Sequence, residues 1–315
     1  MRTVIAGGSG FLGQALSASL ARAGHHLQIL TRRPGGRSTP PASGAIEHIA
    51  WTADGSVGPW AGPCAGADLV VNLAGESIGD RRWSGARKVR LVESRVLATR
   101  SLARFVNESR HPPAAFISAS AIGFYGNRGD ETLTEDAPAG TDFLAGLAAR
   151  WEQEALVAQG VATRVVLLRT GIVLDPGRGA LARMLTPFRC FAGGPFGSGR
   201  QFLSWIHRDD WVSLVRWAVD TPDLRGALNL TAPDPVTNAD FSRALGRALH
   251  RPAFLPAPAF ALRLLLGEMA GPLLLFSQRV VPARAQAGGF RFAHPELDEA
   301  LAQLLGRGVD TGGDR

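Results

Sequence analysis

The sequence predicts an α/β fold in which a parallel β-sheet is covered by helices on both faces. Short runs rich in Val, Ile and Leu alternate with longer segments whose apolar residues recur at helical spacing. A glycine-rich segment joins the first run to the first helical segment. The chain has 315 residues, 45% of them hydrophobic and 19% charged, so it can bury the core that such a fold requires.

The expected strands of the first half are short and rich in β-branched or leucine side chains: 3–6, 27–30, 46–50, 69–72, 115–118 and 163–168. Longer segments with helical spacing separate them: 11–23, 84–108 and 142–159. Because neighbouring parallel strands need a crossover helix, this order predicts a Rossmann-type, doubly wound parallel sheet.

The second half has a different composition, with Pro and Gly dense from 175 to 199. We expect a strand at 202–206, a helix at 209–219 and another strand at 227–230. A helix capped by Asn238 follows at 238–249, then a linker at 252–258 and apolar helices at 259–276. We interpret this half as a smaller, mostly helical substrate lobe.

These expectations divide the chain into domains. Residues 1–174 form a dinucleotide-binding domain, to which 202–230 returns. Residues 175–201 and 231–305 form the substrate lobe and a C-terminal domain, and 306–315 form a frayed tail.

The charge pattern excludes several classes of protein. Only one of the 34 basic residues is a lysine, and because Lys88 follows Arg87, no P-loop exists. The net charge of +7 comes from scattered arginines, so we expect no nucleic-acid binding. Cys64 and Cys190 are too few for a disulfide scaffold or a zinc site; we expect no metal and a cytoplasmic location.

The longest apolar stretch, 259–276, is interrupted by Arg263, Glu268 and Pro272. We therefore expect no membrane span. We interpret this stretch as a pair of helices that belong to the core or form a groove, and contact with a membrane surface is the alternative.

Three glycines form the motif G-x-x-G-x-x-G directly after the first expected strand. Glycine lets backbone N–H groups approach a phosphate closely, and the following helix offers its N-terminus. We expect this loop to bind a dinucleotide through Gly7, Ser9, Gly10, Phe11, Leu12 and Gly13. A tight strand-to-helix turn without a ligand is the alternative.

The end of the second strand predicts which dinucleotide is bound. Thr31, Arg32 and Arg33 stand where an NAD-preferring protein carries Asp or Glu. Arginine can fork onto a 2′-phosphate, so NADP is favoured over NAD. The alternative is that these arginines are ordinary solvated loop residues.

Five segments together resemble an extended short-chain dehydrogenase/reductase: GGSGFLG at 7–13, NLAGE at 72–76, SASAIGFYG at 118–126, LRTGIVL at 168–174 and WIHRDD at 205–210. Within that superfamily the chain resembles epimerase/dehydratase-like proteins that carry a C-terminal domain of unknown function. Segments 233–241, 264–271 and 288–292 match that domain. Some of these relatives are labelled cell-division inhibitors.

The resemblance implies roles for several residues. Leu73, Ala74 and Gly75 would line the ribose and nicotinamide, with Glu76 just beyond them. Thr170 and Ile172 would border the nicotinamide, and Ser118 would lie at the cofactor. Ser120 is the position where the family keeps a serine that bonds the reacting oxygen.

The superfamily's Tyr-x-x-x-Lys pair is absent, because the only tyrosine, Tyr125, is followed four residues later by Gly129. Tyr125, assisted by Ser120, is the first candidate for the acid; structural packing is its alternative. Lys88 could supply the missing ammonium, or lie on a solvated helix surface. His207 could titrate near neutrality, or act as a structural donor.

We therefore expect an NADP(H)-binding oxidoreductase or epimerase that transfers hydride to or from a small carbonyl or hydroxyl substrate. The alternative is a non-catalytic NADP(H)-binding sensor or regulatory protein. A homodimer through helices 84–108 and 142–159 is also expected from the resemblance.

Overall fold

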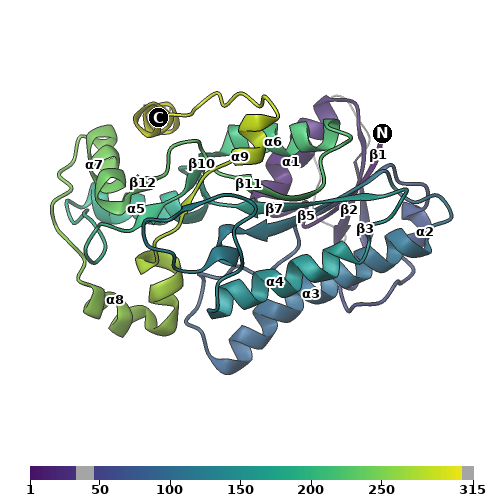
Figure 1. The fold of residues 1–315 in the computed structure, drawn as a ribbon, viewed down its shortest axis with the longest axis horizontal. Helices are drawn as coiled ribbons and strands as arrows, with labels where there is room; N and C mark the ends of the chain where they lie inside the picture. Colours follow the sequence, from purple (N-terminus) through teal and green to yellow (C-terminus); the bar gives the residue numbers. More distant parts are fainter. Residues whose placement is uncertain (33–45, 307–315) are drawn as a thin grey trace, which may run out of the picture. The chain divides into compact units, whose positions relative to one another are not determined.

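A computed structural model describes residues 1–32 and 46–306 of the chain. It contains a seven-stranded sheet with the order β11-β7-β5-β4-β1-β2-β3 (Figure 1). The strands are β1 (Arg2–Ala6), β2 (His26–Thr31), β3 (Ile46–Ala50), β4 (Leu69–Asn72), β5 (Ala115–Ala121), β7 (Arg164–Thr170) and β11 (Gly226–Leu230). The ladders that join β3 through β5 are all parallel, with Val4 opposite Gln28 and Val70.

Helices cover both faces of this sheet, which explains why its central strands are almost continuously apolar. All four residues of β4 are buried, as are residues 3–6 of β1. Figure 1 shows α1 (Phe11–Arg22) on one face, and α3 (Gly85–Glu108) with α4 (Phe143–Leu156) on the other. The predicted α/β fold class is confirmed.

Side-chain caps fix where the two long helices begin. The Ser84 hydroxyl accepts a hydrogen bond from the Arg87 amide at the start of α3. The Asp142 carboxylate accepts from the amides of Leu144 and Ala145 at the start of α4. These bonds satisfy amides that have no partner within the helix, so both helices begin where the sequence predicts.

Contact density divides the chain into two compact units. The first consists of Met1–Phe124, Thr141–Arg169 and Val212–Leu228. It contains the sheet apart from the last residues of β7 and β11, together with helices α1, α3 and α4, α2 (Ala61–Cys64) and most of α6 (Arg208–Asp220). Val70, Leu102, Phe105, Phe116 and Val165 belong to its core.

The second unit consists of Tyr125–Gly140, Thr170–Trp211 and the described residues from Asn229 onward. Its strands form three small pairs: β6 (Thr132–Leu133) with β13 (Arg279–Val280), β8 (Ile172–Leu174) with β10 (Trp205–His207), and β9 (Phe202–Leu203) with β12 (Val236–Thr237). Its helices are α5 (Gly179–Arg189), α7 (Asn238–Leu249), α8 (Ala259–Leu266), α9 (Ala283–Ala287) and α10 (Leu297–Gly306). Single turns occupy Gly267–Met269 and Gly271–Leu275, and another, Ile122–Tyr125, straddles the boundary.

The two units differ from the predicted domains at several segments. Residues 125–140 belong to the second unit because β6 pairs with β13 there. The strand predicted at 202–206 is two strands, β9 and β10, which pair with β12 and β8 of the second unit. Only residues 212–228 therefore return to the first unit.

Three further details complete the comparison with the expected elements. Thr237 provides the side-chain cap of α7, whereas Asn238 accepts a hydrogen bond from the Phe196 amide at 2.6 Å. Beyond residue 306, the tail predicted to be frayed lies outside the described residues. Within the part that the structure describes, no helix is both long and apolar enough to cross a bilayer.

Candidate functional site

The glycine loop lies between β1 and α1, pressed against the end of β4. Gly7 has φ +79°, and a Cβ there would lie 2.5 Å from the carbonyl oxygen of Leu73. A Cβ on Gly13 would lie 2.1 Å from the carbonyl oxygen of Gly7. Both contacts are with backbone atoms that cannot move aside, so the packing requires glycine at both positions.

This loop has the properties of a site for a pyrophosphate. The N-cap of α1 is Gly10, and no side chain caps the first turn or places a carboxylate in it. Ser9 and Gly10 are exposed, while Phe11 and Leu12 are half-buried. The first amides of α1 and its positive dipole end are therefore open to an anion, and the residues present fit a dinucleotide.

Asn72 connects the end of β4 to its neighbours. Its Nδ2 donates to Thr99 Oγ1 at 2.8 Å and to Ser118 Oγ at 3.2 Å. Its Oδ1 accepts from the amide of Ala74 at 3.1 Å, and the Leu73 amide donates to the carbonyl oxygen of Ala6. These bonds hold the predicted residues Leu73, Ala74 and Ser118 at the same edge of the sheet as Gly7.

Glu76, in contrast, is engaged with α3. Its carboxylate forms ion pairs with Arg87 and Arg90. The hydrogen bond from Arg90, together with that from Arg87, holds the pKa of this carboxyl below its usual value. Arg95 donates to the Glu76 carbonyl oxygen at 2.8 Å. Glu76 is thus an ionised anchor for the loop that follows Gly75.

Arg95 is itself largely desolvated. It packs over the Trp151 ring, and burial lowers the pKa of its guanidinium to about 10. A Cβ on Gly75 would lie 3.1 Å from Cζ of Arg95, so the loop rests directly on this side chain. The predicted residues Gly75 and Glu76 are therefore positioned by α3.

The residues predicted to choose the cofactor lie at the end of β2. Thr31 is half-buried, and its carbonyl oxygen accepts a hydrogen bond from the Trp51 amide at 3.1 Å. Arg32 is exposed, so its guanidinium is accessible to an anionic ligand. Arg33 lies outside the described residues.

Ser120, at the end of β5, belongs to a buried series of hydrogen-bonded polar side chains. Its hydroxyl donates to Glu152 Oε1 at 2.6 Å. Arg169 donates from Nε and Nη2 to the two oxygens of Glu152, each at 2.9 Å. The guanidinium of Arg169 also stacks on the Phe124 ring at 3.6 Å. These hydrogen bonds connect β5, α4 and β7 within the first unit.

Glu152 and Arg169 are functional candidates that the sequence interpretation missed. Both are charged residues in otherwise apolar elements, and their side chains are only 6% and 7% exposed. A buried charge needs a partner, so a carboxylate on the apolar face of a helix and an arginine inside an apolar strand were the available signal.

Tyr125 occupies the interior of the second unit and is 0% exposed. Its hydroxyl donates to Asn229 Oδ1 at 2.7 Å, and Asn229 Nδ2 donates to the carbonyl oxygen of Val281. The Asn229 amide donates in turn to Glu135. This arrangement favours the structural alternative for Tyr125 over proton transfer.

Thr170 and Ile172 also belong to the second unit. Thr170 Oγ1 accepts from the Trp211 indole at 3.2 Å, and the Ile172 amide donates to Ser204. In the first unit, the ammonium of Lys88 lies 5.4 Å from the Phe143 ring centroid. Lys88, which belongs to α3, therefore lies next to the first residue of α4.

The predicted titrating residue His207 is held on both ring nitrogens. Nδ1 accepts from the Asp209 amide at 3.1 Å, and Nε2 bonds Gln303 Oε1 at 3.0 Å. Burial lowers the pKa of its imidazole. Ligand atoms of His207, Asp209 and His294 lie within 4.8 Å of one another, but these bonds occupy the His207 nitrogens. The structural role is favoured.

Two family profiles match the chain. Residues 3–230 match the NAD dependent epimerase/dehydratase family, and residues 257–304 match a domain of unknown function, DUF1731. The epimerase family protein YfhF of Bacillus subtilis is 39% identical over 306 residues, which cover 97% of this chain and 98% of that protein.

Solved structures of epimerase proteins are also similar to this chain. The human epimerase family protein SDR39U1 (isoform 2), crystallised with NADPH, superposes with a TM-score of 0.87 at 35% identity, covering 97% of this chain and 99% of that one. A nucleoside-diphosphate sugar epimerase from Corynebacterium glutamicum has a TM-score of 0.75 at 34% identity; the match covers 98% of this chain and 58% of that one.

Proposed function

The chain belongs to the NAD dependent epimerase/dehydratase family, and we propose that it is an NADP(H)-dependent oxidoreductase or epimerase acting on a small carbonyl or hydroxyl substrate. The family resemblance, including the C-terminal domain of unknown function, is thereby confirmed. The expectation of a nicotinamide dinucleotide agrees with the family and with the NADPH bound to the human relative.

The observation that carries the proposal is the glycine loop. The backbone of Gly7 and Gly13 is packed so closely that no Cβ fits, and the first amides of α1 are left uncapped beside it. This is the arrangement that binds a pyrophosphate. Exposed Arg32 at the end of β2 supports NADP(H) over NAD(H), since its guanidinium matches a 2′-phosphate.

Bound NADP(H) would supply or accept the hydride at the substrate carbon. The protein must then hold the substrate oxygen and move its proton. Ser120 is the candidate for this contact, in the position where the family keeps its serine. Because the Ser120 hydroxyl donates a hydrogen bond to Glu152, its oxygen remains able to accept a hydrogen bond from a substrate hydroxyl.

Glu152 would act through Ser120 as a positioning residue. In alcohol oxidation, the substrate hydroxyl would give its proton to Ser120 Oγ while the serine proton passes to Glu152 Oε1, which must then release it to solvent. Carbonyl reduction would reverse both transfers, and Glu152 must first take up one proton from solvent. Arg169 keeps the carboxylate in place through two hydrogen bonds. This route needs neither Tyr125 nor Lys88.

Enzyme assays with a panel of small carbonyl and hydroxyl compounds test this proposal. We expect turnover with NADPH or NADP⁺, a large loss of kcat in Ser120→Ala, and a shifted pH profile of kcat/KM in Glu152→Gln. A merely structural role of Glu152 would lower the yield of folded protein without moving that profile.

A non-catalytic NADP(H)-binding sensor is the second candidate, favoured by the missing Tyr-x-x-x-Lys pair and by the only tyrosine, Tyr125, being buried with its hydroxyl bonded to Asn229. It predicts tight NADPH binding and a partner that recognises only the loaded form. Turnover that Ser120→Ala abolishes would exclude it.

Two further expectations stand as proposals. The free Cys64 and Cys190 agree with a reducing compartment such as the cytoplasm. Helices α3 and α4 pack together through Leu91, Leu147 and Trp151, and we propose that their outer faces pair with a second copy.

A further inference from the structure

Exposed apolar side chains gather on two neighbouring segments of the second unit. The loop after α5 lies along the linker before α8: the Leu255 amide donates to Gly193, and Phe196 pairs with Ala257. These two segments and α8 carry the following exposed side chains, which we call the apolar patch: Phe191 (60%), Phe254 (76%), Leu255 (52%), Phe260 (74%), Leu264 (79%) and Leu265 (69%).

Helix α8 is the most unusual part of this patch. Its sequence, AFALRLLL, contains one charged residue, yet none of its residues is buried. A helix that is apolar on nearly all sides is normally buried or in contact with lipid. Exposed apolar patches of this kind mark an interaction site.

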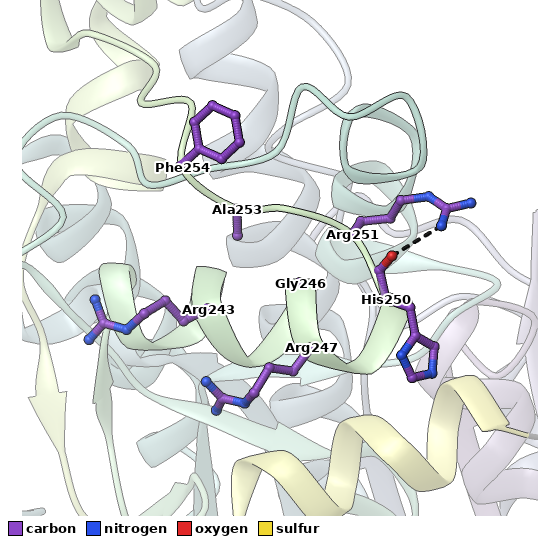
Figure 2. Close-up of a pocket in the computed structure, with 7 residues that line it drawn as sticks. All are labelled: Arg243, Gly246, Arg247, His250, Arg251, Ala253 and Phe254. Atoms are coloured by element: carbon purple, nitrogen blue, oxygen red, sulfur yellow. Dashed lines mark hydrogen bonds between the residues drawn. The ribbon is translucent and has the colours of Figure 1, made fainter.

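Several arginines lie near one member of the apolar patch, Phe254. A pocket of about 770 Å³ at the end of α7 is lined by Arg243, Gly246, Arg247, His250, Arg251, Ala253 and Phe254. Figure 2 shows Arg243 and Arg247 extending from α7, and Phe254 projecting from the segment that follows it. Phe254 therefore belongs both to the pocket and to the apolar patch.

The local charge is strongly one-sided. No Asp or Glu occurs from Phe241 through Gly267, a stretch that contains Arg243, Arg247, Arg251 and Arg263. Among the described residues, no carboxylate pairs with Arg251 or Arg263, and Arg251 stacks on Phe191 at 4.7 Å.

Two acidic residues from outside this stretch do reach it. Asp240 pairs with Arg243 and Asp298 pairs with Arg247. All four side chains are 49–63% exposed. Such surface pairs contribute little free energy, so a phosphate can compete for these arginines.

We propose that the apolar patch and these arginines bind the surface of a bilayer that contains anionic phospholipids. The guanidinium groups would contact headgroup phosphates, while Phe260, Leu264 and Leu265 would enter the boundary between headgroups and acyl chains. A second copy fits less well, because it would bring two sets of arginines together. A small anion would fill the pocket and leave α8 exposed.

Co-sedimentation of the full-length protein with vesicles tests this proposal. One set of vesicles contains phosphatidylcholine alone, and the other contains phosphatidylcholine mixed with phosphatidylglycerol. We expect binding to the mixed vesicles that weakens as salt is added, and little binding to the neutral ones. Equal binding to both sets, or to neither, would overturn the proposal.

Two variants separate the apolar from the charged contribution. Phe260→Ser/Leu264→Gln should weaken vesicle binding about tenfold or more. Arg251→Gln/Arg263→Gln should weaken it about fivefold for each charge removed. All four residues are exposed, so the variants should fold. Unchanged NADPH binding and an unchanged Tm would verify folding independently of the proposed activity.

Matched controls remove similar groups elsewhere. Val157→Ser/Val161→Ser replaces two exposed apolar residues of the first unit, 59% and 106% exposed. Arg22→Gln/Arg150→Gln removes the same net charge from exposed positions. Val157→Ser/Val161→Ser should change vesicle binding little. Arg22→Gln/Arg150→Gln should weaken vesicle binding much less than Arg251→Gln/Arg263→Gln does. Losses equal to those of the patch variants would contradict a localised site.

The competing occupants give different results. Release from vesicles by millimolar glycerol phosphate, at constant ionic strength, would indicate a pocket for a small anion and overturn the proposal. Light scattering in which Phe260→Ser/Leu264→Gln halves the molar mass would instead identify the patch as an interface between copies, and would also overturn it. We expect neither result.

Discussion

The Ser120 hydroxyl donates a 2.6 Å hydrogen bond to Oε1 of Glu152, a carboxylate that Arg169 holds on both of its oxygens. The arrangement places a buried ion pair behind the one serine that the family resemblance assigns to the reacting oxygen. We propose that both the stability of the first unit and the chemistry of the site depend on this relationship.

Removing the charge of Glu152 should therefore destabilise the protein. Glu152→Gln leaves the Arg169 guanidinium buried without its counter-ion, and breaking a buried pair costs about 3 kcal/mol. Glu154→Gln is the control on the same helix, because its partner Arg100 is 39% exposed and surface pairs contribute about 0–1 kcal/mol. Urea unfolding measures both. Equal losses would mean that burial does not distinguish the pairs.

The glycine loop gives a prediction about cofactor binding. Gly13→Ala would place Cβ 2.1 Å from the Gly7 carbonyl oxygen and 2.7 Å from Cα of Gly8. The loop must then shift, so we expect NADPH affinity to fall about tenfold or more, measured by nicotinamide fluorescence. Gly146→Ala, on α4 with nothing within 4 Å, should keep the affinity and stabilise the helix by about 0.5–1 kcal/mol. Unchanged NADPH affinity in Gly13→Ala would argue against the site.

Tyr125→Phe separates structure from catalysis. The change leaves the Oδ1 atom of Asn229 buried without its donor, which costs about 1–3 kcal/mol in the free energy of unfolding. The kcat should stay within a factor of about two, because the proton route through Ser120 does not use the phenol. A stable variant without turnover would show instead that Tyr125 is the acid.

The two cysteines should differ sharply in reactivity. Burial raises the pKa of the Cys64 thiol to about 12, whereas Cys190 is exposed. Because the thiolate is the reactive form, an aromatic disulfide reagent should modify one thiol in the native protein and two after unfolding. Mass spectrometry should find the native label on Cys190; a native label on Cys64 would contradict the structure.

Much of the fold could be predicted from the sequence because it depends on local pattern. Strands β1, β2 and β4 are almost wholly buried and read as apolar runs, so their predicted ends are correct within a residue. The bounds predicted for β3 are also correct, although this edge strand has only Ile49 buried. The two-residue strands β6 and β13 carry no such pattern. They form by pairing with each other across the second unit, which no local signal reveals.

The candidate site divides in the same way. The glycine loop and its neighbours Leu73 and Ala74 follow from one motif and its position after a strand. The roles of Glu152 and Tyr125 depend on partners in other elements: Glu152 on α4 is paired with Arg169 on β7, and the partner of Tyr125, Asn229, lies more than a hundred positions along the chain. Such pairs exist only after the chain has folded.

Absorbance of enzyme-bound nicotinamide during mixing with the carbonyl panel tests the central claim most directly. We expect NADPH to be oxidised by at least one compound, with the rate lost in Ser120→Ala and retained in Tyr125→Phe. Tight NADPH binding without hydride loss to any compound would contradict the account and favour the sensor.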